Sequence, residues 1–225
     1  MELEHVTHVL HLDTDVLLYS SIQELHGVYG GMTTDCGLMI PEQDFSSFMW
    51  FASGHISYWT RAFLERFCDF VLRSFKDDGL KQYYRKKWAW HQATNSPGGI
   101  CDMTTLFLFW RENQRMITNL AMEVQGNVFD VNMSLPSNYQ QDEYVMEGNC
   151  KKIRFVKKSK PVFFKIASPS TPVSVHAIHF QGKAKKYIPK YLSGWKSLSM
   201  YQRELRSIYH TLRKRTHLLR LFGVQ

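Results

Sequence analysis

The feature that most constrains the fold is the apolar run of residues 6–18, which is typical of a β-strand and carries two aspartates one residue apart, Asp13 and Asp15. Successive side chains of a strand point to opposite faces, so we expect the two carboxylates to share a face. Carboxylates held so close repel each other unless a cation lies between them, and Mg²⁺ and Mn²⁺ prefer oxygen ligands. A motif this short more commonly arises by chance, as turn-forming or helix-capping carboxylates, so the metal interpretation depends on residues far downstream.

The composition indicates a packed globular chain with anionic partners. Of the 225 residues, 44% are hydrophobic and 14% are aromatic, which is enough for one substantial core. The 28 lysines and arginines exceed the 20 acidic residues and give a net charge of +8, much of it in the C-terminal third. Such a surplus favours nucleotides, phosphorylated glycans, nucleic acid or acidic membrane as partners, and it does not choose among them.

From the sequence as written, we expect neither a secreted nor a membrane-spanning protein. No apolar run approaches the roughly 18 residues of a membrane span, and the N-terminus lacks the basic start and apolar core of a signal peptide. We therefore expect a cytoplasmic or peripheral membrane protein. The cysteines form no Cys-x-x-Cys pair and are expected to be buried thiols: Cys36, Cys68, Cys101 and Cys150.

Hydrophobic periodicity predicts helices and strands that alternate early in the chain. The expected helices cover residues 19–25, 56–75 and 80–90, and the expected strands cover residues 35–41, 127–132, 153–156, 162–166 and 173–180. The helix over residues 56–75 is predicted because apolar side chains recur at spacings of three and four from Ile56 through Trp59 and Phe63. Strands cluster later in the chain, so we expect a single domain of mixed α/β class.

The C-terminal segment, residues 193–225, places apolar residues on one helical side and basic residues around the rest. A basic amphipathic helix of this kind can make a peripheral contact with an anionic membrane. It can equally be a terminal helix that docks on its own domain and exposes its basic face to solvent. We therefore separate this segment from a domain formed by residues 1–192.

A second polar motif follows the last predicted strand, where His179 leads into Gly182 and a group of lysines. A glycine allows close backbone approach, lysines attract phosphate, and imidazole is a common metal ligand. Together with Asp13-Thr14-Asp15, this segment resembles the motifs of glycosyltransferases of the GT-A fold, which use nucleotide-diphosphate sugars and a divalent metal. The second motif, His-Phe-x-Gly-x-x-Lys in glycogenin-like members, matches residues 179–185 at every fixed position.

The resemblance covers roughly residues 6–187 and implies a role for each matched residue. Asp13 would contact the donor ribose or the metal, Asp15 and His179 would bind Mn²⁺ or Mg²⁺, and Gly182 and Lys185 would meet the diphosphate. The implied activity is transfer of a sugar from a nucleotide-diphosphate donor to a glycan or other hydroxyl acceptor. The family often continues with Pro-Trp after the lysine, where this chain has lysine and tyrosine, and the subfamily stays open.

Two further segments, residues 53–55 and 98–102, resemble those that line the donor-sugar and acceptor pocket in such enzymes. Within them Asp102 is the remaining candidate for catalysis. It would be the general base of an inverting transfer, or a hydrogen-bond partner of sugar hydroxyls in a retaining one. A carboxylate beside Thr104 is more commonly a helix cap.

The position of the acidic pair departs from the family pattern. GT-A enzymes place a nucleotide-binding βαβ half before it, and one such unit needs about 30 residues. Only twelve residues precede Asp13. We therefore expect an N-terminally shortened, single mixed-sheet GT-A-like domain with flanking helices, which binds nucleotide weakly or is inactive alone. A missing N-terminal anchor would make the Golgi lumen the alternative location.

Two other functions stay open. A nucleotidyltransferase can use a similar acidic metal pair, but this activity does not explain residues 179–185. A non-enzymatic, basic nucleic-acid-binding domain would explain the positive charge and the aromatic residues, and it predicts salt-sensitive binding that is indifferent to Asp13. The transferase hypothesis expects no nucleic-acid partner.

Overall fold

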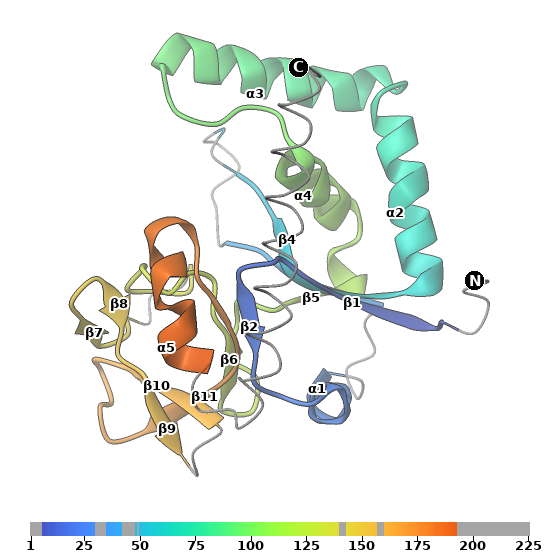
Figure 1. Cartoon of the computed structure of the whole chain (residues 1–225). Coiled ribbons are helices and arrows are strands. Elements are labelled where there is room, and N and C mark those ends of the chain that lie inside the picture. Colours follow the sequence, from blue (N-terminus) through green and yellow to red (C-terminus); the bar gives the residue numbers. More distant parts are fainter. Residues whose placement is uncertain are drawn as a thin grey trace, which may run out of the picture. The chain divides into compact units, whose positions relative to one another are not determined.

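The computed structural model describes residues 6–29, 35–41, 48, 50–139, 143–156 and 160–192 (Figure 1). The chain divides into two compact units, residues 1–185 and 186–225. The second unit contributes helix α5 (Ile188–Leu192), and the predicted amphipathic segment 193–225 lies outside the described residues. Over the described ranges the chain is mixed α/β, as expected, with five α-helices and several sheets. None of these helices combines the length and hydropathy needed to cross a membrane.

The first sheet has four strands in the order β1-β4-β3-β5. These are β1 (His8–Leu12), β4 (Ser53–Thr60), β3 (Cys36–Met39) and β5 (Ile117–Asn119). Strands β1 and β3 run antiparallel to β4, and β5 runs parallel to β3. Val9 lies opposite Trp59, and His11 lies opposite Ser57, so these four side chains share one face of the sheet. This face forms one wall of the site described below.

Two helices pack against β4 and against each other: α2 (Arg61–Ser74) and α4 (Asp102–Glu112). Helix α3 (Asp78–Thr94) connects them in sequence and confirms the helix predicted over residues 80–90. Together they enclose a core in which seven aromatic side chains are buried: Trp50, Trp59, Phe63, Phe70, Tyr84, Phe107 and Phe109. The apolar residues 105–110 are therefore the centre of helix α4.

The predicted helix over residues 56–75 is wrong at its start, because residues 53–60 form strand β4. Helix α2 begins only at Arg61, where the Thr60 hydroxyl accepts a hydrogen bond from the Phe63 amide. Ile56 and Trp59 belong to different core clusters on the two faces of the sheet. A strand buried on both faces carries apolar residues on each, so a spacing of three arises there without a helix.

The prediction of four buried thiols is half wrong. Cys36 and Cys150 are buried, whereas Cys68 and Cys101 are exposed. Cys68 lies on α2, and Cys101 is the residue that precedes α4, so both belong to helices that keep one side in solvent. An apolar preference of the cysteine side chain is therefore a weak guide to burial on an amphipathic helix.

The second sheet is built around the long strand β11 (Pro172–His179). Strand β11 pairs antiparallel with β2 (Val16–Leu18) and β10 (Lys160–Phe164), and parallel with β6 (Asn127–Phe129). The edge strand β9 (Arg154–Val156) pairs with β10, and β7 (Met146–Glu147) pairs with β8 (Cys150–Lys151). Helix α1 (Ile22–Tyr29) follows β2, and two short 3₁₀ helices complete the description: η1 (Gln114–Met116) and η2 (Gly182–Tyr187). The predicted later strands are confirmed, with shifted ends.

The run of residues 6–18 is two strands in different sheets. Strand β1 ends at Leu12 and β2 begins at Val16, and the turn between them is closed by a hydrogen bond of 3.1 Å from the Val16 amide to the Asp13 carbonyl. Figure 1 shows the chain passing from β1 into β2 through this bend. Asp13 and Asp15 therefore lie in the joint between the two sheets, and they do not share one face of a continuous strand.

His176, in the middle of β11, provides a test of this arrangement through pH. Its ring is 4% exposed, its Nδ1 lies 2.6 Å from the Ser20 hydroxyl, and Glu24 and Lys160 are the charged groups nearest to it. Burial, opposed by Glu24 and aided by Lys160, lowers the pKa of His176 to about 4. Because the unfolded histidine has a pKa near 6.5, protons bind the unfolded chain more readily between these two values.

We therefore expect the wild-type chain to lose about 3 kcal/mol of stability through His176 as the pH falls from 6.5 to 4. His176→Phe should remove this contribution and flatten the pH dependence, since phenylalanine fits among the neighbouring aromatic rings. Urea denaturation of both chains at several pH values in this range measures the difference. Equal slopes for the two chains would show that His176 does not titrate in this way.

Candidate functional site

The joint between the two sheets is held by main-chain hydrogen bonds from distant segments. The Asp13 amide donates to the His55 carbonyl at 2.9 Å, and the Phe180 amide donates to the Asp15 carbonyl at 2.9 Å. In the β2–β11 ladder, Val16 is the direct partner of His179. The strand pairing thus places the end of β11 beside the acidic turn, although more than 160 residues separate them in sequence.

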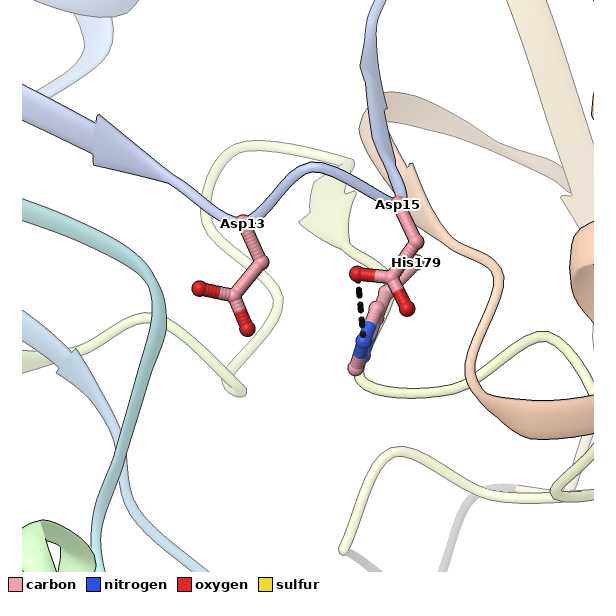
Figure 2. Close-up of side chains that lie close together, drawn as sticks. All are labelled: Asp13, Asp15 and His179. Atoms are coloured by element: carbon pink, nitrogen blue, oxygen red, sulfur yellow. Dashed lines mark ion pairs between the residues drawn. The ribbon is translucent and has the colours of Figure 1, made fainter. Parts of the chain in front are cut away.

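Three potential metal ligands meet at this joint. One ligand atom each from Asp13, Asp15 and His179 lie within 4.8 Å of one another. Figure 2 shows both aspartates projecting from the turn, with a dashed line that joins Asp15 to the imidazole of His179 at the end of β11. Asp13 is exposed, whereas Asp15 and His179 are buried. A mixed oxygen and nitrogen set of this kind is compatible with Mn²⁺ or Mg²⁺, the carboxylates suiting either ion and the imidazole a transition metal.

The tautomer of His179 determines which ring atom faces the carboxylates. Its Nδ1 lies 2.6 Å from the Val131 carbonyl oxygen, which can only accept a hydrogen bond, so Nδ1 carries a proton. The Nε2 atom lies 3.5 Å from Asp15 Oδ1. In the neutral ring both of these atoms hold lone pairs, and a cation between them, either a proton or a metal ion, removes the repulsion. Metal-binding histidines commonly donate their second ring nitrogen to a carbonyl in this way.

Asp15 is ionised in this setting. Burial of the carboxyl opposes its charge, but the ion pair with Lys185, at 3.0 Å, and the nearby His179 outweigh burial and hold the pKa of Asp15 below its usual value. The Lys185 side chain is 56% exposed and therefore can leave Asp15 for another anion without a large desolvation cost. A negative ligand arriving at the joint would meet this ammonium group.

A cavity of about 700 Å³ opens beside the cluster. The three potential ligands line it together with Gly182 and Lys185, and the shared sheet face with helices α2 and α4 forms the remaining wall. The apolar part of this wall comes from five side chains: Val9, Trp59, Leu64, Phe67 and Leu106. The cavity therefore has a charged end at the joint and an apolar end between the helices and the sheet.

Asp102 lies on the wall of this cavity and is separate from the potential metal ligands. It is the first residue of α4 and is exposed. The cap that begins this helix is formed by Cys101, whose backbone amide and thiol both contact the Thr104 hydroxyl. Asp102 is therefore not the N-cap residue, and its carboxylate is available to a molecule in the cavity.

The backbone conformation of Gly182 explains why the motif of residues 179–185 has a glycine at this position. Its φ angle is +59°, in the left-handed region that side chains rarely adopt, and a Cβ atom there would meet open space. Constraint by the backbone angle, rather than by crowding, therefore favours glycine at this position. The residue directly precedes the lysines of η2 and turns the chain along the edge of the cavity.

His55 is a residue of the site that no motif marks in its own right. Its ring stacks on His179 at a centroid distance of 4.2 Å, and its Nδ1 lies 2.7 Å from the Ser53 hydroxyl. Burial and the neighbouring His179 lower the pKa of His55 to about 3, so the ring is neutral. A neutral ring can support His179 without adding a positive charge to the site. Residues 53–55 were expected in the pocket, but not as a packing surface for His179.

Asp130 and Lys151 form a buried ion pair behind His179 that sequence reasoning also missed. Lys151 is part of a lysine pair that resembles surface charge, yet its side chain is completely buried. The signal that could have identified Asp130 is its position as the single charged residue in the apolar run of residues 128–131. Nothing in the sequence pattern pairs it with Lys151.

Comparisons with protein-family models, with curated proteins and with solved structures find no match to this chain. The resemblance to GT-A enzymes therefore depends on the two short motifs.

Proposed function

We propose that the chain is a metal-dependent glycosyltransferase with a GT-A-like fold, which transfers a sugar from a nucleotide-diphosphate donor to a hydroxyl acceptor. The observation that carries this proposal is the meeting of Asp13, Asp15 and His179 at one end of a cavity, with the Nε2 lone pair of His179 directed at Asp15. The motifs that suggested the family supply all three residues. The proposal assigns them to a single Mn²⁺ or Mg²⁺ ion.

The charged end of the cavity suits a diphosphate. A divalent ion bound there would neutralise the charge that develops on the departing nucleotide diphosphate. Lys185 lies next to the carboxylate of Asp15, is largely exposed, and would exchange this partner for a phosphate oxygen. Gly182 is exposed and lines the same cavity as Lys185. These features favour a diphosphate-containing donor over an uncharged ligand.

Asp102 is the proposed catalytic residue on the acceptor side of the cavity. Its exposed carboxylate lies at the start of α4, outside the group of potential metal ligands. In an inverting transfer it would accept the proton of the attacking hydroxyl, and in a retaining transfer it would instead hydrogen-bond to sugar hydroxyls. Analysis of the anomeric configuration of the product separates these two roles.

The test is calorimetric titration of the chain with a panel of nucleoside diphosphates, with and without Mn²⁺, followed by product analysis with labelled nucleotide sugars. We expect weak binding that requires Mn²⁺, and we expect any group that is transferred to be the labelled sugar and not the nucleotide. Transfer of the nucleotidyl group would instead identify a nucleotidyltransferase. Salt-sensitive binding of nucleic acid that is unchanged in Asp13→Ala would refute the proposal in favour of a nucleic-acid-binding domain.

A further inference from the structure

The ammonium group of the buried Lys151 donates all three of its protons to acceptors in one segment of the chain. Its ammonium donates to Asp130 Oδ1 at 2.5 Å, to Asn138 Oδ1 at 2.8 Å and to the Asn132 carbonyl at 3.0 Å. These acceptors all belong to the segment between β6 and β7, and the lysine and aspartate side chains are completely buried. The three protons of the ammonium group are therefore fully used in tying this segment together.

The same segment forms three hydrogen bonds with His179. The His179 amide donates to Asp130 Oδ2 at 3.3 Å, its Nδ1 donates to the Val131 carbonyl at 2.6 Å, and its carbonyl accepts from the Met133 amide at 2.9 Å. Each contact comes from a residue at or next to an acceptor of Lys151. The orientation of the imidazole thus depends on the shape of a turn that the lysine organises.

Asn138 links Lys151 to the backbone of Val131, the residue whose carbonyl contacts the His179 ring. Its Oδ1 accepts from the Val131 amide at 3.3 Å as well as from Lys151, and its Nδ2 donates to the Phe129 carbonyl at 2.9 Å. The peptide groups on both sides of Asp130 are thereby fixed from outside the strand. The Val131 carbonyl belongs to the next peptide group, so these buried bonds hold it indirectly, by fixing the backbone that precedes it and, through Lys151, the Asn132 carbonyl that follows it.

Stability alone does not account for this arrangement. Removing two charges from water costs several kcal/mol for each, and well-packed apolar residues in place of a buried ion pair are often as stabilising or more so. The segment that Lys151 holds together also contacts the backbone and ring of His179. Its conformation therefore determines the orientation of the imidazole.

We propose that Lys151 is a positioning residue, which acts through Asp130, Asn138 and the Val131 carbonyl to keep the proton of His179 on Nδ1 and leave Nε2 as the free ligand atom facing Asp15. The metal-binding consequence rests on the proposed function. The state of the ring does not, because it is a property of the chain without any ion. Two readouts therefore separate the two proposals.

The experiment compares the wild-type chain with the double variant Asp130→Asn/Lys151→Met, which removes both buried charges and approximately keeps their volumes. Long-range ¹H–¹⁵N NMR of the imidazole rings, with His179→Gln to assign the signal, reports which nitrogen carries the proton. We expect Nδ1 to carry a proton throughout the wild-type population, a part of the double-variant population to lose the proton from Nδ1, and Mn²⁺ affinity about 10- to 100-fold lower in the variant.

The matched control is Lys87→Met. Lys87 is also a buried lysine, 4% exposed, and its ammonium donates to the carbonyls of Phe48 and Trp50, away from His179. Its loss should perturb stability while the His179 tautomer and Mn²⁺ affinity stay unchanged. Asn138→Ala, which removes the link to Val131 and leaves the ion pair, replaces the double variant if the latter does not fold.

A folded double variant, or Asn138→Ala, with the wild-type tautomer and the wild-type Mn²⁺ affinity would overturn the positioning role. If the wild-type chain binds no Mn²⁺ and the protonation of the His179 ring still changes in the double variant, the metal site is refuted and the role of Lys151 is supported. A tautomer change in the Lys87→Met control would show that any loss of a buried lysine disturbs the ring, and would also overturn the proposal.

Discussion

Asp15→Asn is expected to weaken Mn²⁺ binding by at least about 100-fold, because loss of a coordinating carboxylate exceeds the 10- to 100-fold cost typical of losing an indirect partner. Asparagine keeps the size of the side chain, and the main-chain bond between the Asp15 carbonyl and the Phe180 amide is unaffected by the substitution. The fold should therefore persist. Electron paramagnetic resonance of free Mn²⁺ during a titration measures the loss directly, and calorimetry with a nucleoside diphosphate measures its consequence.

Asp69→Asn is the matched control for this prediction. Asp69 lies on an exposed position of α2, so its substitution removes the same charge without touching the joint between the sheets. Equal Mn²⁺ affinity in both variants would mean that Asp15 does not coordinate the ion. Binding lost in Asp15→Asn but retained in Asp69→Asn is the outcome that the geometry predicts.

Lys151→Met alone is expected to lower the free energy of unfolding by about 3–5 kcal/mol. The substitution leaves the Asp130 carboxylate completely buried without its cation, next to an Asn138 amide and an Asn132 carbonyl that also lose their donor. Burial lowers the pKa of Lys151 more strongly than Asp130 raises it, which reflects how costly this location is for a charge. Urea denaturation at neutral pH measures the effect.

The double variant Asp130→Asn/Lys151→Met should recover much of this loss, because no unpaired charge then remains in the interior. The exposed pair between Lys81 and Asp78 provides the comparison, since Lys81→Met should cost less than about 1 kcal/mol. A single Lys151 variant as mild as Lys81→Met would show that Asp130 takes up a proton or that water reaches it. Failure of the double variant to recover would point to lost packing around Lys151.

The elements that could be predicted from the sequence either are buried on one side or are bounded by clear turn residues. Helix α3 keeps one side in solvent, and strands β10 and β11, although buried on both faces, are short apolar runs that end at clear turn residues. Strand β4 was missed because it is paired on both edges and covered on both faces, so that Ile56 and Trp59, on opposite faces, show a spacing of three that is also typical of a helix. In such a strand the choice between helix and sheet depends on partners, not on local pattern.

The run of residues 6–18 illustrates the same limit at the site. Its apolar character predicts extended structure on both sides of the acidic pair, and both strands exist. The two strands belong to different sheets because β1 pairs with β4, whereas β2 pairs with β11. Asp13 and Asp15 therefore lie in the turn between the two sheets, and this turn is next to the end of β11, which carries His179.

By itself, the sequence determined the chemical character of the site: two carboxylates, an imidazole, a glycine and a lysine in two short motifs, in a chain of mixed α/β class. Only the tertiary structure decided that these motifs meet, which tautomer His179 adopts, and that His55, Asp130 and Lys151 support it. The reason is physical. Side-chain identity is local, whereas strand pairing between residues 16 and 179 and the burial of one ion pair depend on how the whole chain packs.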